Sequence, residues 1–277
     1  MTAPSTTDPS AGYLARLARN VTSAVAHLVR SPSDPRAAEA ARKFRRDAFI
    51  LMATGAIAVA VLMLWVDLPE IKLMPPRNEP SLWPVRILTD FGKAAFVMWT
   101  IAALLLAVTL AAPGARQGLQ PRLLRLMTEL QYLVLAVLVP IMAGEVVKWI
   151  VGRGRPFVGP DPFTFSHFAG TSAYASFPSA HSITAVALAF AVSALWPKLR
   201  GLMIVYALLI IASRLVLLAH HPSDVVAGAI FGLIGAMAVR QWFAARRLGF
   251  TIGQGGAILP AAGPGACSVL IKSEPNL

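Results

Sequence analysis

Residues 201–224, GLMIVYALLIIASRLVLLAHHPSD, begin as an apolar run and end in charged and imidazole side chains. The apolar run at 201–218 is close in length to the about 20 residues that a helix needs to cross the hydrocarbon of a bilayer. An arginine, Arg214, is always charged and suits a phosphate, and His220 is able to act as a nucleophile or proton carrier. The carboxylate of Asp224, four residues on, is expected to hold the other nitrogen of that imidazole. A membrane helix ending in this way predicts either interface anchors or a site at the membrane surface.

The whole chain has the composition of an integral membrane protein. Of its 277 residues, 56% are hydrophobic and 14% are charged, and its mean hydropathy is +0.64, which is outside the range of an ordinary soluble domain. The net charge of +12 fits cytoplasmic loops that collect Lys and Arg. Because no nucleic-acid-binding motif accompanies the charge, we expect no nucleic-acid partner.

Apolar segments of about the required length predict an all-α integral membrane bundle of six transmembrane helices. They lie near 47–66, 93–112, 126–147, 181–197, 201–218 and 224–243. Residues 1–46 are predicted to be a cytoplasmic N-terminal segment with an amphipathic helix, which lies either on the membrane surface or against another domain. A second helix is expected to start at Pro35, with Asp34 as its N-cap. Residues 47–250 form the membrane domain, and residues 251–277 are predicted to be a flexible tail.

The distribution of basic residues predicts an orientation. Most of the 25 Lys and Arg residues flank the predicted helices on one side, which the positive-inside rule places in the cytoplasm together with both termini. The segments 67–93, 148–180 and 214–224 then face the outside of the cytoplasmic membrane. Consecutive transmembrane helices cross the membrane in opposite directions. By this parity of crossings, the end of the third helix, the start of the fourth, the end of the fifth and the start of the sixth lie at the same membrane face.

The side chains that meet at this face suit a bound dianion. They are Lys148, Arg155, His181, Arg214, His220 and Asp224. Three cations can neutralise a phosphate and the charge of its transition state. Ser179 is expected to cap the fourth helix, so that the amides of Ala180 and the next residues point at the anion. Without a row of clustered carboxylates, we expect no metal and no cofactor, and an imidazole that attacks phosphorus directly.

These residues fall into three motifs that resemble the signature of the type 2 phosphatidic acid phosphatase superfamily, the membrane lipid phosphate phosphatases. The family pattern is Lys, six residues, Arg-Pro; then Pro-Ser-Gly-His; then Ser-Arg, five residues, His, three residues, Asp. This chain has KWIVGRGRP at 148–156, PSAH at 178–181 and SRLVLLAHHPSD at 213–224. Ala180 stands where the family usually has Gly. If that position has the negative φ of a first helical turn, Ala keeps the amide donor and is tolerated.

The resemblance implies a role for each matched residue. His220 would be the nucleophile that forms a phosphohistidine, Asp224 would orient it, and His181 would be the general acid and then the base. Lys148, Arg155, Ser179, Ala180 and Arg214 would hold the phosphoryl oxygens. Outside the motifs, Arg153 is interpreted as a solvated side chain or a headgroup contact, and Glu145 as the i,i+3 partner of Lys148.

The resemblance also implies the partners: the membrane and a lipid phosphate substrate, with the oligomeric state left open. Phosphatidic acid, phosphatidylglycerophosphate, undecaprenyl pyrophosphate and lipid A phosphate present a similar group to the same residues, so selectivity would lie in 67–92 and 156–177. A lipid-to-lipid phosphotransferase would use the same site with another acceptor. An anionic-lipid transporter is disfavoured, because the charges gather at one interface and not near the midplane.

Overall fold

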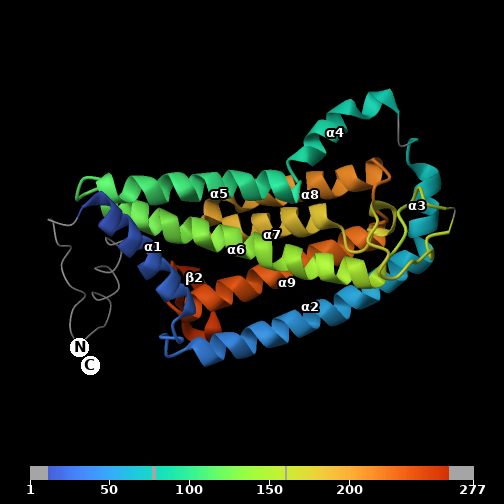
Figure 1. The fold of residues 1–277 in the computed structure, drawn as a ribbon. Coiled ribbons are helices and arrows are strands. Elements are labelled where there is room, and N and C mark those ends of the chain that lie inside the picture. Colours follow the sequence, from blue (N-terminus) through green and yellow to red (C-terminus); the bar gives the residue numbers. More distant parts are fainter. Residues whose placement is uncertain (1–11, 77–78, 160, 262–277) are drawn as a thin grey trace.

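The computed structural model describes residues 12–76, 79–159 and 161–261, and this part of the chain is mainly helical (Figure 1). The α-helices are α1 (Tyr13–Val29), α2 (Ala37–Trp65), α3 (Asp67–Leu73), α4 (Trp83–Asp90), α5 (Ala94–Ala111), α6 (Gln120–Val151), α7 (Ala180–Leu195), α8 (Arg200–Val216) and α9 (Pro222–Ala245). Short 3₁₀ turns are η1 (Pro80–Leu82), η2 (Ala112–Gly114), η3 (Ser172–Tyr174), η4 (Pro197–Leu199) and η5 (Gln254–Gly256), and the two strands are β1 (Phe250–Ile252) and β2 (Ile258–Pro260).

The six predicted transmembrane segments correspond to α2, α5, α6, α7, α8 and α9. Among the described residues, five helical segments, which contain all of these except α7, are long and apolar enough to cross a membrane. The remaining helix, α7, is apolar but has 16 residues. The prediction of an all-α membrane bundle is confirmed. Helix α2 starts at Ala37, before the predicted span, because the basic segment and the apolar run form one continuous helix.

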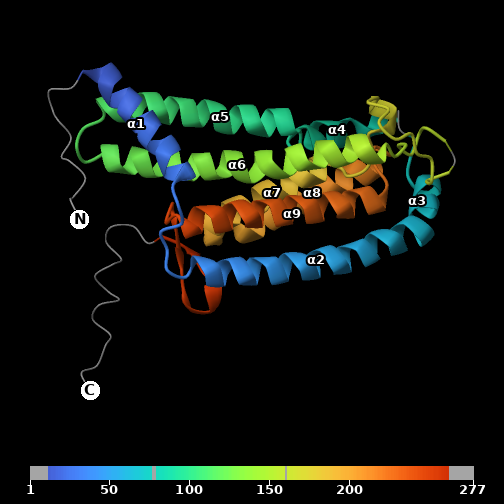
Figure 2. The same ribbon diagram turned by 60° about the horizontal axis from the view of Figure 1, so that its bottom comes forward.

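The six helices run side by side, and the remaining elements gather at the two ends of the bundle (Figures 1 and 2). One end carries α3, α4 and the loop 152–179, and we call it the α3–α4 end. The opposite end, which we call the α1 end, carries α1 and the hairpin of β1 and β2. Helix α7 packs against α6, α8 and α9. The end of α6, the end of α8 and the start of α9 therefore deliver residues to the α3–α4 end, where α7 begins.

Two glycines let α9 approach α7 closely. A methyl group added at Gly228 would lie 2.5 Å from the carbonyl oxygen of Ser179, and one added at Gly232 would lie 2.5 Å from that of Ile183. Residues four apart share a helix face, and small residues on such a face allow backbones in a membrane to pack without separation. The start of α9 is consequently fixed against the start of α7, where the Ser179 amide donates to the Asp224 carbonyl at 3.0 Å.

Helix α1 lies across the α1 end. The Tyr13 hydroxyl donates to the carbonyl oxygen of Leu110 at 2.7 Å, and the Trp242 indole donates to that of Leu28 at 3.1 Å. No residue of α1 is buried within the described part of the chain, and its apolar side chains, such as Leu14 and Val29, are exposed. The prediction that either the membrane surface or another domain covers this face stays a prediction.

Two predicted boundaries differ from the structure. Helix α2 begins two residues after Pro35, and the Asp34 carboxylate accepts from the amide of Arg36 at 2.9 Å in a turn before the helix. Beyond residue 250, an antiparallel hairpin continues to Pro260 and buries Phe250 and Ile252 in the core. Ordered structure therefore extends into the predicted tail, because these apolar side chains pack in the interior. Residues 1–11 and 262–277 lie outside the described residues.

Candidate active site

Helix ends deliver the predicted site residues to the α3–α4 end, as the parity of crossings requires. Lys148 lies near the end of α6 and Arg155 in the following loop, while Ser179, Ala180 and His181 open α7. Arg214 lies in the last turn of α8, His220 in the connection to α9, and Asp224 in the first turn of α9. We call Lys148, Arg155, His181, Arg214 and His220 the phosphate cluster.

The loop after α6 is folded back on itself. Gly152 ends α6 with a φ of +56°, and a Cβ there would lie 1.8 Å from the Ser166 carbonyl oxygen, so only glycine fits. Arg153 pairs with Phe165 in an isolated antiparallel bridge, and the Arg155 amide donates to the Ala173 carbonyl at 3.0 Å. In an extended segment, residues two apart share a side, yet Arg153 is fully buried and Arg155 half-buried. A turn follows at residues 155–158, in which the Val158 amide donates to the Arg155 carbonyl at 2.9 Å.

Arg153 is the centre of a buried ion network, which corrects its interpretation as a solvated side chain. Its guanidinium donates to Asp67 at 2.7 Å, Asp224 at 2.6 Å and the Ser223 hydroxyl at 2.6 Å. Both carboxylates and the guanidinium have 0% exposure. Buried charges are stable only when paired and hydrogen-bonded, and here the Pro162 carbonyl accepts two further bonds from the guanidinium.

The network continues from both carboxylates to the backbone. Asp67 accepts from the Ser223 amide at 3.0 Å and from its hydroxyl at 2.5 Å. Asp224 accepts from the Ser176 hydroxyl at 2.5 Å and from the His221 amide at 3.0 Å. We call Asp67, Arg153, Ser176, Ser223 and Asp224 the buried ion network. It joins α3, the loop 152–179 and α9 beside His220.

The imidazole of His220 contacts this network through a backbone carbonyl. Its Nδ1 lies 2.9 Å from the Ser176 carbonyl oxygen and 4.0 Å from the Asp224 carboxylate. The predicted direct contact of Asp224 with the imidazole is therefore replaced by an indirect one. The Asp224 carboxylate accepts from the Ser176 hydroxyl, and the Ser176 carbonyl contacts the ring. A carbonyl oxygen only accepts, so Nδ1 carries the proton and Nε2 of the neutral ring keeps a lone pair.

The surroundings of His220 favour the neutral ring. The side chain is buried, with 2% exposure, and burial lowers the pKa of His220 well below its usual range. The positive charges of Arg214 and Arg155, together with His181 and Lys148, lower this pKa further. A neutral imidazole among cations suits attack on an anion that the cations hold.

The remaining members of the phosphate cluster are held from different elements. The Arg214 guanidinium is buried and donates to the Thr89 hydroxyl of α4 at 2.7 Å. Lys148 pairs with Glu145, which confirms the predicted i,i+3 partner. Nε2 of His181 is buried and makes no hydrogen bond to any described residue. An anionic ligand would supply the acceptor that this nitrogen needs when protonated.

Ser179 departs from the prediction that its hydroxyl caps α7. It occupies the N-cap position, but its side chain makes no capping hydrogen bond, and its buried hydroxyl has no partner within the described chain. Ala180 is the first residue of α7 and is absent from the described non-glycine residues with positive φ. The methyl group at this family Gly position therefore fits the helical backbone.

Sequence reasoning missed four supporting residues: Asp67, Thr89, Ser176 and Ser223. One signal for Asp67 was available, because an acidic residue directly after an apolar span is costly unless it has a partner. Among the described residues, no group of three or more His, Cys, Asp and Glu side chains forms a candidate metal site.

Comparisons with known proteins agree with the motifs. The model of the PAP2 superfamily matches residues 129–248. The Lipid A 1-phosphatase of Rhizobium johnstonii is 33% identical over 180 residues, which cover 63% of this chain and 72% of that protein. The Lipid A 1-phosphatase of Rhizobium etli is 33% identical over 183 residues, covering 63% and 76%.

A third relative has a different named substrate. The Escherichia coli K12 protein named "Putative undecaprenyl-diphosphatase YbjG" is 32% identical over 122 residues, covering 41% of this chain and 59% of that protein. No solved structure matches the chain. From the family match and from the extent of the two Rhizobium relatives, the chain belongs to the PAP2 superfamily, the type 2 phosphatidic acid phosphatases that its three motifs resemble.

Proposed function

We propose that this chain hydrolyses the phosphomonoester or pyrophosphate of a membrane lipid through a phosphohistidine formed on His220. The observation that carries the proposal is the hydrogen bond between Nδ1 of His220 and the Ser176 carbonyl oxygen at 2.9 Å. It assigns the proton to Nδ1 and leaves Nε2 as the nucleophilic nitrogen of a buried, neutral ring. The names of the three relatives, which all describe lipid phosphatases, support the same reaction class.

The reaction proceeds in two balanced displacements. Nε2 of His220 bonds to phosphorus while the bond from phosphorus to the lipid oxygen breaks, and His181 gives its proton to that oxygen. His181 then takes a proton from water, the water oxygen bonds to phosphorus, and the phosphorus–nitrogen bond breaks. Inorganic phosphate leaves, and both imidazoles return to their starting states.

The phosphate cluster supplies the electrostatic part of catalysis. Lys148, Arg155 and Arg214 hold the phosphoryl oxygens and stabilise the charge that develops on them. The Ser179 hydroxyl and the Ala180 amide at the start of α7 donate to the same oxygens. Asp224 fixes Ser176, and through the Ser176 carbonyl it fixes the ring of His220. None of these roles requires a metal ion, so the proposed reaction is metal-independent.

A pocket beside Lys148 suggests the headgroup. It has a volume of about 310 Å³, and its lining includes Glu145, Trp149, Thr171 and Tyr174. Aromatic faces with hydroxyl and carboxylate groups around them suit a sugar, which has apolar C–H faces and hydroxyl edges. Two relatives are named for the 1-phosphate of lipid A. Lipid A is therefore the first substrate to test, ahead of undecaprenyl pyrophosphate, phosphatidic acid and phosphatidylglycerophosphate.

The proposed site faces the outside of the cytoplasmic membrane, and both termini lie in the cytoplasm. This orientation rests on the excess of Lys and Arg in the segments that flank the helices at the α1 end. The lipid tails stay in the bilayer while the headgroup enters among the ends of α6, α7, α8 and α9.

The decisive experiment is phosphate release by purified protein across these four lipids, with and without chelator. His220→Ala is expected to lower turnover at least about 10⁴-fold, as loss of a nucleophile does in other covalent mechanisms. His27→Ala, which changes an exposed histidine of α1 at the opposite end of the bundle, is the matched control and should keep activity. Normal turnover by His220→Ala would contradict the mechanism, and activity lost with chelator would contradict metal independence. Accumulation of a phosphorylated lipid in place of free phosphate would instead identify a phosphotransferase.

A further inference from the structure

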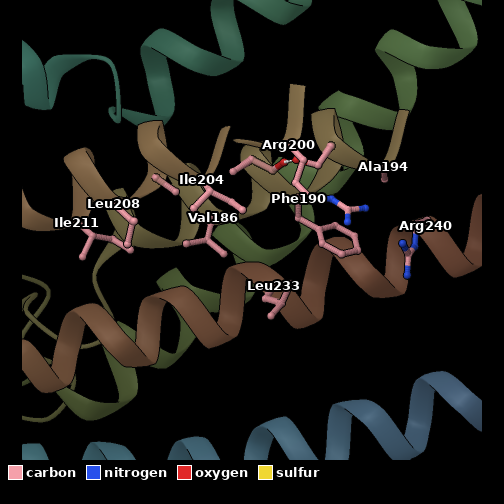
Figure 3. A pocket seen from close by; sticks show the side chains of 12 residues that line it. Val186, Phe190, Ala194, Arg200, Ile204, Leu208, Ile211, Leu233 and Arg240 are labelled. Atoms are coloured by element: carbon pink, nitrogen blue, oxygen red, sulfur yellow. Dashed lines mark hydrogen bonds between the residues drawn. The ribbon is translucent and has the colours of Figure 1, made fainter. Parts of the chain in front are cut away.

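A second pocket lies between α7, α8 and α9, away from the phosphate cluster. It has a volume of about 430 Å³, which is within the range of small-molecule sites. Figure 3 shows apolar side chains, including Ile204, Leu208 and Ile211, leading toward Arg200 and Arg240. The pocket is therefore an apolar groove with a cationic end.

The cationic end is far from the proposed chemistry. Arg200 is the first residue of α8, and Arg240 lies near the end of α9, whereas the catalytic residues lie at the opposite ends of these helices. Sixteen residues separate Asp224 from Arg240, which in an α-helix is a rise of about 24 Å. The two arginines thus belong to the leaflet at the α1 end and do not contact the substrate phosphate.

Within the part of the chain that the structure describes, Arg200 and Arg240 have no carboxylate partner. The Arg240 guanidinium lies over the Phe190 ring, 4.7 Å from its centroid, and its Nε is buried with no hydrogen-bond partner among the described residues. Arg200 is exposed at the start of α8, whereas Arg240 is half-buried within the predicted span 224–243. A cation within a membrane segment is costly and marks a candidate ligand site.

The chemistry of the groove selects its occupant. Guanidinium groups bind phosphate oxygens through planar, charge-assisted hydrogen bonds, and the apolar walls favour a hydrocarbon chain. The outer face of α8 also exposes Leu202 and Val205, so the groove adjoins a surface that lipid covers in the bilayer. We propose that this groove binds an anionic phospholipid of the α1-end leaflet, with its phosphate on Arg200 and Arg240 and one acyl chain along α8.

This inference is independent of the proposed catalytic function, and a binding measurement tests it. Native mass spectrometry of the full chain in detergent would compare phosphatidylglycerol with phosphatidylcholine of identical acyl chains. The wild-type protein should retain one phosphatidylglycerol in preference to phosphatidylcholine. The double variant Arg200→Gln/Arg240→Gln should bind phosphatidylglycerol about tenfold more weakly or worse, and phosphatidylcholine as before.

A matched double variant controls for net charge. Arg122→Gln/Lys198→Gln removes two exposed cations at the same end, outside the pocket lining, and should keep the preference for phosphatidylglycerol. Equal loss in both double variants, or no preference in the wild-type protein, would overturn the proposal. So would a wild-type dimer that the pocket variant alone dissociates, because a second copy would then cover the groove.

A third measurement needs no variant and tests the groove itself. Dihexanoyl phosphatidylglycerol has the same headgroup but chains too short to follow α8 from Arg200 to Ile211. We expect it to bind at least about tenfold more weakly than the long-chain lipid, because its chains bury less apolar surface along α8. Equal affinity would show that the acyl chain lies outside the groove and would overturn that assignment.

Discussion

Two groups of ionisable side chains lie next to each other at the α3–α4 end, and they are neutralised in different ways. In the buried ion network, Asp67 and Asp224 face Arg153, and all three have 0% side-chain exposure. In the phosphate cluster, Lys148, Arg155 and Arg214 contribute positive charge around the ring of His220, and Lys148 pairs with Glu145, which is 49% exposed. The first group is neutralised by contacts among its own buried side chains, whereas the second gathers cations around imidazole rings, an arrangement that suits an anionic ligand. We therefore propose that the first group supports the fold and that the second binds the substrate phosphate.

Replacement of Arg153 should have the largest effect on stability. Arg153→Gln leaves Asp67 and Asp224 buried without their guanidinium, and breaking one partner of a buried ion pair costs about 3–5 kcal/mol. We expect a clearly lower unfolding temperature in detergent, measured by differential scanning fluorimetry or calorimetry. An unfolding temperature within about 1 °C of the wild-type value would show that the network does not support the fold.

Arg155→Gln provides the matched comparison, because it makes the same substitution two residues away. It should lower kcat/KM by about 10²–10³, as loss of one preorganised charge contact does, while leaving the unfolding temperature close to that of the wild-type protein. Initial rates of phosphate release on the best lipid substrate measure the effect. If Arg155→Gln destabilised the chain as much as Arg153→Gln, the division between support and binding would be wrong.

The sequence was sufficient to predict the all-α membrane bundle and the end of the bundle to which the phosphate-cluster residues are delivered. Lys148, His181 and Arg214 lie at the ends of apolar runs, and parity alone brings these three residues to one face. Hydrophobic length is readable in a membrane protein because the bilayer excludes other structures. The pairing of Lys148 with Glu145 also followed from their i,i+3 spacing.

The buried ion network was beyond sequence reasoning for a physical reason. Arg153 is separated from Asp67 by 86 residues and from Asp224 by 71, and no periodicity relates them. The loop 152–179 reads as Gly- and Pro-rich coil, so nothing in it distinguishes the buried Arg153 from the half-buried Arg155. The Ser176 carbonyl that holds His220 is a backbone group, and its position depends on the fold of the whole loop.

Glu70 extends the comparison, because it is a buried carboxyl group that forms no ion pair with any described residue. Its two oxygens have no hydrogen-bond partner among the described residues. Burial, with the charges of Asp67 and Asp224, raises the pKa of Glu70 from 4.5 to about 7. The folded protein therefore keeps this proton up to about pH 7, whereas the unfolded chain releases it above about pH 4.5, so Glu70 lowers stability as pH rises through this window.

Glu70→Gln should remove this penalty. We expect the variant to be more stable than the wild-type protein by on the order of 1–2 kcal/mol at pH 8, with the difference disappearing near pH 4.5, where both side chains are neutral. Unfolding temperatures at pH 5 and pH 8 check the sign. A variant that is less stable at pH 8, or a difference that is equal at both values, would show that ionisation of Glu70 does not oppose folding.

The smallest effect is expected at Ala180, on the phosphate-cluster side of the comparison. Ala180→Gly restores the residue that the family usually has, keeps the amide donor and removes only a methyl group from the first residue of α7. Gly in a helix costs about 0.5–1 kcal/mol relative to Ala, and this is an upper limit for a first turn. Activity should therefore stay within about twofold of the wild-type value, and stability should fall slightly.

Helix α9, which packs against the start of α7, provides the matched variant with the opposite substitution, from Gly to Ala. Gly228→Ala would place a methyl group 2.5 Å from the Ser179 carbonyl oxygen, so it must push the start of α9 away from the start of α7 and reduce both stability and kcat/KM. Rates and unfolding temperatures of the two variants, measured together, distinguish an effect of the backbone conformation at residue 180 from an effect of the contact between α7 and α9. A large gain of activity in Ala180→Gly would mean that substrate binding needs a backbone at this position that Ala opposes.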